Sequence, residues 1–404
     1  MSKSNETTPN VPTLRFREFT DSWTLIPIKK LLRFQNGINA DSTKYGKGIK
    51  YISVSDILNN QYITYACIKG LIDIDEKTFN KFIVEYGDIL FQRSSETFED
   101  IGRANVYLDK EHSATFGGFV IRGKKISDYN PLFFRYLLCT HNARKQTVRM
   151  GAGAQHYNIG QEGLEKICLY FPCLQEQQKI SAFLSAIDNK IAVQNKIISK
   201  YETLIKGLYT QLQSKSAKKE YRICDIVKCH SVGLLSKENL TESGSKKCIL
   251  YGELFTTYDE VINEIKSRTN VDGYISQGNE ILFPSSTTVD AMSLIAPSAL
   301  NEKGILLGGD MFVLELLPGF NNEYISYYLN TIAKRNLAKY AQGTTITHLY
   351  FEHIKNVLLY LPDITIQLSV ASKMRKLKTK IQIEKEMLSA LQKQKAFLLQ
   401  SMFI

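Results

Sequence analysis

Two long amphipathic stretches, residues 175–212 and 365–402, constrain the fold of this chain more than any other feature. In the first, apolar residues recur at alternating spacings of four and three, a pattern typical of a coiled coil. Its seam is Ile180, Leu184, Ile187, Ile191, Gln194, Ile198, Tyr201, Ile205, Leu208 and Leu212. Adding 190 to each number gives a second seam, with polar breaks at Glu384 and Lys395: Val370, Met374, Leu377, Ile381, Glu384, Leu388, Leu391, Lys395, Leu398 and Met402.

The two stretches are each predicted to form one helix of about 38 residues, roughly 57 Å long. Such a helix is not stable in water with its apolar stripe exposed, because most helical stability comes from burying that face. We therefore expect the helices to pack on each other. Because the second begins about 150 residues after the first ends, it has to run back along it, which predicts an antiparallel pair with a globular body at each end.

The composition is that of a folded protein with a polyanionic partner. The 404 residues are 44 % hydrophobic and carry a net charge of +11, which favours nucleic acid or another acidic surface without choosing between them. No apolar run approaches a membrane span, and residues 1–10 lack the apolar core of a signal peptide, so a cytoplasmic protein is expected. The seven cysteines are scattered, and Cys224, Cys229 and His230 lack the spacing of a metal site; none is predicted.

The region before the first long helix is predicted to be a mixed α/β domain. Short β-branched and aromatic runs alternate with turn residues, predicting strands at residues 50–54, 61–65, 88–91, 104–108 and 119–121. Pro131 is expected to start a helix that continues towards Arg149. A glycine-rich break at residues 151–157 then precedes a short helix, a strand at 167–171, and Pro172 before the long helix.

The same order of features returns after a polar segment at residues 214–219. Gly-Asp-Ile-Leu-Phe at 87–91 returns as Gly-Asn-Glu-Ile-Leu-Phe at 278–283, and Gly117-Gly118 returns as Gly308-Gly309. Gly153 and Pro172 return as Gly343 and Pro362. A nearly constant shift indicates a tandem duplication. The predicted fold class is α+β: a leader (1–20), an α/β domain (21–160), a helical region (161–213), a second α/β domain (214–350) and a second helical region (351–404).

Known catalytic motifs are missing from the sequence. No two prolines are adjacent, which removes the Asp/Asn-Pro-Pro-aromatic motif of amino-methyltransferases acting on DNA bases, and there is no phosphate-binding GxxxxGK[ST] loop or HExxH metal motif. Pro362-Asp363 matches the start of a PD-(D/E)xK nuclease site, but no ExK follows. No catalytic residue is predicted.

Matched positive charges precede each glycine break and are the predicted phosphate contacts. A run of charges is also typical of a solvated helix face, but its repetition in both halves favours contact with phosphates, which anchor a protein on a duplex without reading its sequence. The candidates are Arg144, Lys145 and Arg149 in the first half and Lys334, Arg335 and Lys339 in the second.

Hydroxyl, amide and arginine side chains in two loops of each half are the predicted base-reading groups. Gln pairs with adenine, Arg with guanine, and Ser or Thr with either, although hydroxyls are as often found capping helices and turns. One set follows the Ile-Leu-Phe strands, another lies in the glycine breaks, and Arg103 is a separate candidate. The candidates are Arg93, Ser94, Ser95, Arg103, Gln155, His156 and Tyr157, then Ser285, Ser286, Thr287, Thr344, Thr345, Thr347 and His348.

The order of variable domain, long helix, variable domain and long helix resembles the specificity subunit of type I restriction-modification systems. The resemblance covers the chain from Leu14 onward and includes Gly-Asp-Ile-Leu-Phe, the loop at 151–157 and the segment Pro172-x-x-x-Glu176-Gln177-x-x-Ile180 before the first helix. In the second copy this segment keeps Pro362 and Gln367 but has Ile366 in place of the glutamate.

The resemblance implies two target recognition domains that each read one half of a split double-stranded DNA sequence, with the helices fixing the unread gap. It implies a subunit without catalytic activity or a cofactor of its own. Its partners would be two modification subunits that use S-adenosylmethionine to methylate adenine and restriction subunits that use ATP and Mg²⁺. Two alternatives stay open: a coiled-coil adaptor between protein-binding domains, and an enzyme, such as a nuclease, with an unfamiliar active site.

Overall fold

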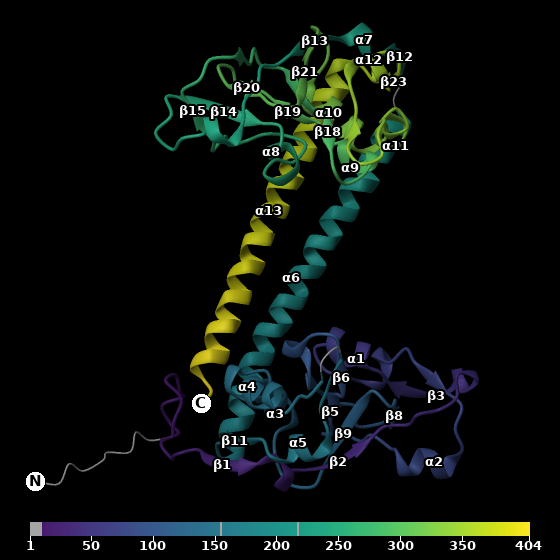
Figure 1. The fold of residues 1–404 in the computed structure, drawn as a ribbon, viewed down its shortest axis with the longest axis vertical. Helices are drawn as coiled ribbons and strands as arrows, with labels where there is room; N and C mark the ends of the chain where they lie inside the picture. Colours follow the sequence, from purple (N-terminus) through teal and green to yellow (C-terminus); the bar gives the residue numbers. More distant parts are fainter. Residues whose placement is uncertain (1–9, 154–155, 216–217) are drawn as a thin grey trace, which may run out of the picture. The chain divides into compact units, whose positions relative to one another are not determined.

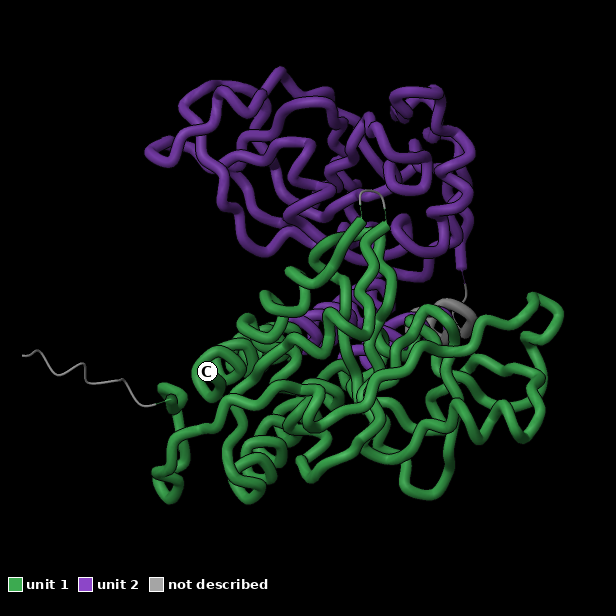
Figure 2. The backbone as a smooth tube through the Cα atoms, turned by 60° about the horizontal axis from the view of Figure 1, so that its bottom comes forward, with its two compact units in different colours: residues 1–197, 384–404 green, residues 198–383 purple. Residues whose placement is uncertain are grey.

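The computed structural model describes residues 10–153, 156–215 and 218–404. They form two compact units: unit 1 contains the chain up to Ile197 together with Glu384–Ile404, and unit 2 contains Ile198–Ile383 (Figure 2). Each unit therefore holds one α/β body and a part of both long helices.

Unit 1 contains the elements that precede the first long helix (Figure 1). Its strands are β1 (Thr24–Pro27), β2 (Leu32–Asn36), β3 (Tyr45–Ile52), β4 (Leu71–Ile72), β5 (Ile89–Gln92), β6 (Ser94–Ser95), β7 (Ala104–Val106), β8 (Thr115–Phe116), β9 (Val120–Lys125), β10 (Tyr157–Asn158) and β11 (Cys168–Phe171). Its helices are α1 (Val54–Asn59), α2 (Glu76–Lys81), α3 (Pro131–Leu138), α4 (His141–Arg149) and α5 (Gln161–Glu165), followed by α6 (Leu174–Lys215), which continues into unit 2.

Unit 2 repeats this order with different loops. Its strands are β12 (Lys219–Arg222), β13 (Val227–Ser231), β14 (Lys246–Leu250), β15 (Arg268–Thr269), β16 (Tyr274–Ile275), β17 (Glu280–Pro284), β18 (Ser286–Thr287), β19 (Ser298–Leu300), β20 (Leu306–Gly308), β21 (Met311–Leu316), β22 (Thr347–His348) and β23 (Leu358–Leu361). Its helices are α7 (Ile223–Ile226), α8 (Glu253–Thr256), α9 (Ala291–Leu294), α10 (Asn322–Thr331), α11 (Lys334–Ala338) and α12 (Phe351–Ile354), followed by α13 (Ile364–Ser401), which returns to unit 1.

The sheets confirm the internal duplication. Each unit has a four-stranded antiparallel sheet of the same topology, β2-β9-β5-β7 in unit 1 and β13-β21-β17-β19 in unit 2. Two short ladders are repeated as well. The β1-β11 ladder of unit 1 corresponds to β12-β23 in unit 2, and β6-β10 corresponds to β18-β22. Because the strand pairing agrees where the loop sequences differ, the two bodies share one scaffold.

Four local predictions differ from the structure of unit 1. The strand expected at residues 50–54 ends at Ile52, and Val54 is the first residue of α1. Residues 61–65 form only a single bridge, Ile63 to Tyr107. The helix expected from Pro131 to Arg149 is divided into α3 and α4, because the Thr140 hydroxyl accepts a hydrogen bond from the Ala143 amide and caps a new helix. Strand β9 begins at Val120, which leaves Phe119 in the preceding turn and 70 % exposed.

The long helices pack antiparallel, as the seams predict. In unit 1, higher residue numbers on α6 meet lower numbers on α13: the Asp188 carboxylate lies 2.5 Å from the Lys395 ammonium, and the Gln194 amide donates to the Glu384 carbonyl at 3.1 Å. Two of the polar breaks in the seams thus face each other, and the third, Lys395, is paired with a buried carboxylate that also accepts from the Tyr136 hydroxyl at 2.7 Å.

One buried glutamine in each unit connects the start of a long helix to its α/β body. The Gln177 side chain accepts from the Asn130 amide at 2.9 Å and donates to the Pro172 carbonyl at 2.9 Å. Gln367 makes the same pair of bonds, with the Asn321 amide at 3.0 Å and the Pro362 carbonyl at 2.8 Å. We call these two arrangements the glutamine clamps. They explain why glutamine is retained in both copies of this segment.

The glutamate beside the first clamp has a separate role. Glu176 is fully buried and pairs with the Arg15 guanidinium at 2.7 Å, which ties the N-terminal segment to α6. The same segment reaches the end of α13, since the Leu14 amide donates to the Ser401 carbonyl at 2.9 Å. Arg15 belongs to the N-terminal segment, which packs on unit 1. The counterpart of Glu176 in unit 2, Ile366, therefore does not need to form an ion pair with Arg15.

Among the described residues, no helix has the length and apolar character needed to cross a lipid bilayer.

Candidate nucleic-acid interface

In unit 1 the two predicted base-reading segments lie side by side. Strand β5 ends at Gln92, the chain passes Arg93, and β6 pairs antiparallel with β10, with Ser95 opposite Tyr157 and Ser94 opposite Asn158. The Ser94 hydroxyl bonds the Asn158 side chain at 2.5 Å. This two-residue ladder therefore joins two segments that lie roughly 60 residues apart in the chain into one surface.

Unit 2 has the equivalent arrangement. Strand β17 ends at Pro284, Ser285 follows, and β18 pairs with β22, with Ser286 opposite His348 and Thr287 opposite Thr347. Ser285 and Ser286 are largely buried, whereas Thr344 and Thr345 are exposed at the tip of the second loop. The exposed hydroxyls are thus the ones free to meet a ligand, and the buried ones support the loop.

The glycine in each break is required by the shape of the loop. Ala152 and Asn158 form a bridge that closes the first loop, and Gln342 and His348 close the second. Gly153 has a φ of +138° and Gly343 a φ of +118°. A Cβ atom would lie 2.1 Å from the His156 carbonyl oxygen in the first loop. At Gly343 the corresponding distance, to the Ile346 carbonyl oxygen, is 2.0 Å, so only glycine fits either turn.

The remaining base-reading candidates of unit 1 differ in how they are held. His156 is exposed and Tyr157 is half-buried, its ring 5.2 Å from that of Phe98; Gln155 lies outside the described residues. Arg93 is half-buried, and its guanidinium donates to the Gly118 carbonyl at 3.3 Å. Arg103 is exposed and pairs with the Asp100 carboxylate at 2.6 Å.

The six predicted phosphate contacts fall into two groups. Arg144 is half-buried on α4 and donates to the Glu99 and Ile101 carbonyls at 2.8 and 2.7 Å, and burial lowers the pKa of its guanidinium. Its counterpart Lys334 is half-buried too, and burial lowers the pKa of its ammonium. Lys145, Arg149, Arg335 and Lys339 are exposed. The exposed four are available to phosphates, while Arg144 holds the loop that follows β6.

A hollow of about 380 Å³ beside the β6-β10 ladder is lined partly by residues that the sequence did not predict to contact DNA. Ser94, Ser95 and His156 share its lining with Gln92, Glu96 and Asp100. Hydrogen bonds from Thr97 and then from Arg103 lower the pKa of Asp100, so it is a carboxylate at neutral pH. A carboxylate accepts from the cytosine amino group. These residues adjoin Arg93-Ser94-Ser95 in the chain, which is the signal that could have found them.

In unit 1 the Arg93-Ser94-Ser95 segment leaves the four-stranded sheet at the edge where β2 and β5 end and β9 begins (Figure 1). The main-chain amide of Arg93 donates to the Phe119 carbonyl at 2.9 Å, which joins the end of β5 to the turn before β9. In unit 2 the amide of Ser285 donates in the same way to the Asp310 carbonyl at 2.8 Å. We call this the loop edge of each unit.

Comparison with known proteins identifies the scaffold. A family model described as "Type I restriction modification DNA specificity domain" matches residues 22–203 and again residues 215–393. These two matches cover most of the chain. The chain belongs to the type I restriction-modification DNA specificity family.

Solved structures share the fold of this specificity subunit. The S subunit of a type I restriction-modification system from M. genitalium is similar over 98 % of this chain and 99 % of its own, with 16 % sequence identity and a TM-score of 0.63. A chain from a study of complex assembly and conformational transition in the type I R-M system is similar over 93 % of this chain and 96 % of its own. Its sequence identity is 12 % and the TM-score is 0.52. At such identities the likeness concerns the fold.

Proposed function

We propose that each recognition domain of this specificity subunit reads one half of a two-part DNA sequence through its loop edge. The observation that carries the proposal is the repeated ladder, β6-β10 and β18-β22, which presents different side chains on the same scaffold. Unit 1 offers serine, arginine, histidine and carboxylate groups there, and unit 2 offers mainly threonine. Different donors and acceptors in the major groove select different bases, so the two half-sites are expected to differ.

The exposed basic residues supply the contacts that do not depend on sequence. Replacing Lys145 and Arg149, or Arg335 and Lys339, with Ala should weaken binding to all duplexes alike and flatten its salt dependence, because fewer counterions are released. Arg144→Ala should instead alter the preferred bases, since Arg144 positions the Glu99 to Ile101 loop through two carbonyls. Binding measured against salt concentration on several sequences separates these two effects.

The antiparallel helices are proposed to set the length of the unread gap. Inserting one heptad after Gln194 and another after Glu384 lengthens both helices at facing positions and keeps both seams in register. Seven residues add roughly 10 Å, so the gap should grow by about three base pairs while both half-sites stay the same. An unchanged gap would contradict this role for the helices.

The subunit is further proposed to be non-catalytic and to recruit its enzymes. Two modification subunits would bring S-adenosylmethionine and restriction subunits would bring ATP and Mg²⁺, with no cofactor held by this chain. The study of complex assembly among the similar structures supports an assembled state for such chains.

The decisive test is to express the chain with a cognate modification subunit in a host free of DNA methylation and to map methylated adenine across the genome at single-base resolution. Methylation confined to one two-part motif with a fixed gap is the expected result. If the assembled complex forms and no motif appears, the chain is a coiled-coil adaptor without sequence readout. Cleavage or methylation by the purified chain alone would identify it as an enzyme.

A further inference from the structure

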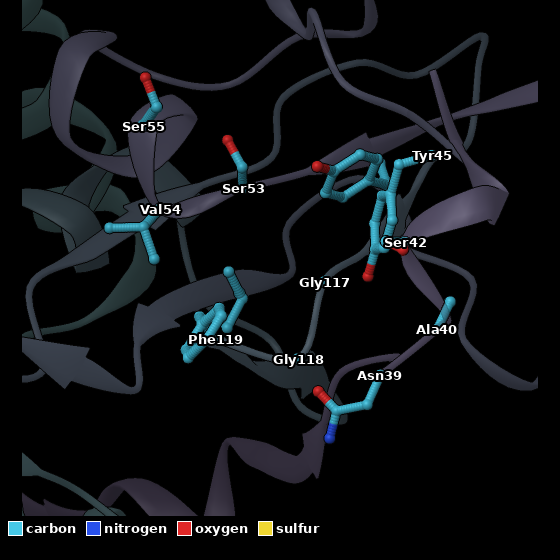
Figure 3. Close-up of a pocket in the computed structure, with 12 residues that line it drawn as sticks. Asn39, Ala40, Ser42, Tyr45, Ser53, Val54, Ser55, Gly117, Gly118 and Phe119 are labelled. Carbon is cyan, nitrogen blue, oxygen red and sulfur yellow. The ribbon is translucent and has the colours of Figure 1, made fainter. Parts of the chain in front are cut away.

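A second hollow at the loop edge of unit 1 is lined by none of the residues predicted to contact DNA. It measures about 720 Å³ and is lined by Asn39, Ala40, Ser42, Tyr45, Tyr51, Ser53, Val54, Ser55, Gly117, Gly118, Phe119 and Val120. We call it the tyrosine pocket. Figure 3 shows Tyr45 and Phe119 on opposite sides of it.

The lining has the chemistry of a site for a flat, uncharged, hydrogen-bonding ring. None of its twelve side chains is charged, which disfavours phosphate, carboxylate or metal inside it. Its aromatic walls offer faces for stacking. The Asn39 amide and the serine hydroxyls offer both donors and acceptors at the level of those walls. A nucleobase combines these requirements, because it is planar and neutral and has polar atoms along its edge.

The walls are held in place before any ligand arrives. The Tyr45 and Tyr51 rings meet edge to face at 5.3 Å. Tyr51 lies between two glycines, since a Cβ atom would come within 2.6 Å of its ring at Gly70 and within 3.2 Å at Gly117. Ser53 is fixed by its hydrogen bond to Asp56 at 2.7 Å. A pre-organised site loses little conformational entropy on binding.

The pocket lies beside the segment proposed to face DNA, so a nucleobase that enters it would come from the bound duplex. Phe119 is 70 % exposed at its rim, and the Arg93 main chain and guanidinium hold the Gly118-Phe119 turn through two hydrogen bonds. The pocket therefore adjoins the Arg93-Ser94-Ser95 segment proposed to face DNA. An exposed aromatic ring at such a place can enter the base stack, as apolar wedges do in proteins that kink or unstack a duplex.

We propose that the tyrosine pocket receives one base displaced from the half-site that recognition domain 1 reads, with Phe119 filling the space left in the stack. This deepens the proposed function and rests on it. Stacking on the tyrosines offsets part of the cost of unstacking the base. No bond is made or broken in this step, and the displaced base is held for recognition.

The corresponding place in unit 2 has a different character. Gly308 and Gly309 return there, but the Leu235 side chain lies where a Cβ at Gly308 would point, at 2.4 Å, and the Tyr251 ring lies 2.9 Å from a Cβ at Gly309. The counterpart of Phe119 is Asp310, whose negative charge is repelled by DNA. The proposal is therefore restricted to the half-site of domain 1.

The test uses the complex of the full chain with its modification subunits and duplexes carrying the mapped target. Each base pair is replaced in turn by a mismatch. A mismatch weakens binding where a base is read in the stack, but it strengthens binding where the base is displaced, because the displacement becomes easier. We expect one position in the half-site of domain 1, other than the base that is methylated, where the mismatch tightens binding at least about fivefold.

Two variants connect that gain to the pocket. Phe119→Ala removes the exposed wedge, and Ala40→Trp fills the cavity without touching Phe119; each should abolish the gain at that position. Tyr86→Ala is the matched control, because Tyr86 is an exposed aromatic residue before the other end of β5, and it should keep the gain.

Other outcomes separate this inference from the function on which it rests. If no position shows a gain, or if the gain survives in either pocket variant, the pocket does not receive a base, although the half-sites are still read. If the wild-type complex binds no duplex selectively, the proposed function itself is wrong.

Discussion

Single side chains decide how the helices are joined to the recognition domains. Each glutamine clamp satisfies one partly buried amide of the α/β body and one buried carbonyl at the point where a strand becomes a long helix. Such groups are costly to leave without a partner in the protein interior, at about 1–3 kcal/mol each. The clamp is thus a fixed joint, and it is the same in both copies.

Replacing Gln177 with Ala should lower the free energy of unfolding of unit 1 by about 2 kcal/mol or more, because both partners lose their hydrogen bond. Gln367→Ala should do the same in unit 2. Gln178→Ala, one residue away and exposed, is the control and should change stability by less than about 0.5 kcal/mol. Denaturant unfolding measures all three, and equal effects of Gln177→Ala and Gln178→Ala would refute the clamp.

Glu280 makes the stability of unit 2 depend on pH. Its side chain is fully buried and accepts from the Tyr274 hydroxyl at 2.8 Å, and burial raises its pKa above the ordinary 4.5. A raised pKa means that the folded state binds the proton more tightly than the unfolded chain does. The contribution of the Glu280 carboxyl to the stability of unit 2 is therefore complete below the ordinary pKa, and it is lost as the pH rises through the raised pKa.

The variant Glu280→Gln should weaken this pH dependence while keeping a hydrogen bond to Tyr274. We expect the unfolding midpoint of the wild type to fall more steeply than that of the variant as the pH rises above the ordinary pKa of 4.5. Glu302→Gln, which removes an exposed carboxylate paired with Lys247, should follow the wild type, because exposed pairs contribute little. Parallel curves for the wild type and Glu280→Gln would contradict the expectation.

Side-chain roles were the part of this protein least accessible from sequence. Arg144 and Lys145 are neighbours in a matched basic run, yet one is bound to two main-chain carbonyls and the other is exposed. The difference arises from which side of α4 faces the loop at residues 99–101, and that depends on a contact between distant segments. The sequence predicts Phe119 as the first residue of a buried strand, because apolar residues follow it. In the structure the strand begins one residue later.

At the scale of elements, long regular patterns were predictable and short ones were not. The seams predicted helices at 175–212 and 365–402, and the structure has Leu174–Lys215 and Ile364–Ser401. A seam repeated over several turns averages out local exceptions such as Gln194. Two-residue strands such as β6 and β10 carry no periodic signal and exist only because they pair. The candidate segments were found from the sequence, whereas their pairing was not.

The loop glycines test whether loop shape determines base reading. Gly153→Ala and Gly343→Ala each place a Cβ against a carbonyl oxygen in a backbone conformation that alanine rarely adopts. Each variant should disturb recognition of one half-site, with a loss of at least about tenfold in affinity for that half, since a shifted loop misplaces its hydrogen bonds. Methylation mapping shows which half-site is affected.

Gly207 on α6 is the matched control, because it is exposed and helical and nothing lies near its missing side chain. Gly207→Ala should stabilise the helix by up to about 1 kcal/mol and leave both half-sites intact. If either loop variant behaves like Gly207→Ala, base reading does not depend on that turn.

At the scale of the whole molecule, unit 1 is assembled from two separate parts of the chain. Phe403 stacks on Phe133 at 5.4 Å and meets Trp23 edge to face at 6.2 Å, and Leu398 and Met402 are buried in the same core. The tandem repeat predicted two similar halves. The completion of the first half by residues from the end of the second helix follows from the antiparallel pairing.

Deleting residues 402–404 should destabilise unit 1 and spare unit 2. Losing a buried methionine or aromatic side chain costs about 2–5 kcal/mol each. Hydrogen exchange should therefore accelerate across residues 14–197 while residues 220–360 exchange as before. Phe397→Ala, which removes a 60 % exposed ring from the same helix, should leave both regions unchanged. Equal acceleration in both units would contradict the division described.

This division has a consequence for biosynthesis. A ribosome completes every residue of unit 2 before it reaches Glu384, the first residue of the second part of unit 1. The recognition domain made first therefore waits for its last core residues until the domain made second can already have folded. A translation product that stops before residue 384 would carry one complete recognition domain and one whose core lacks Leu398, Met402 and Phe403.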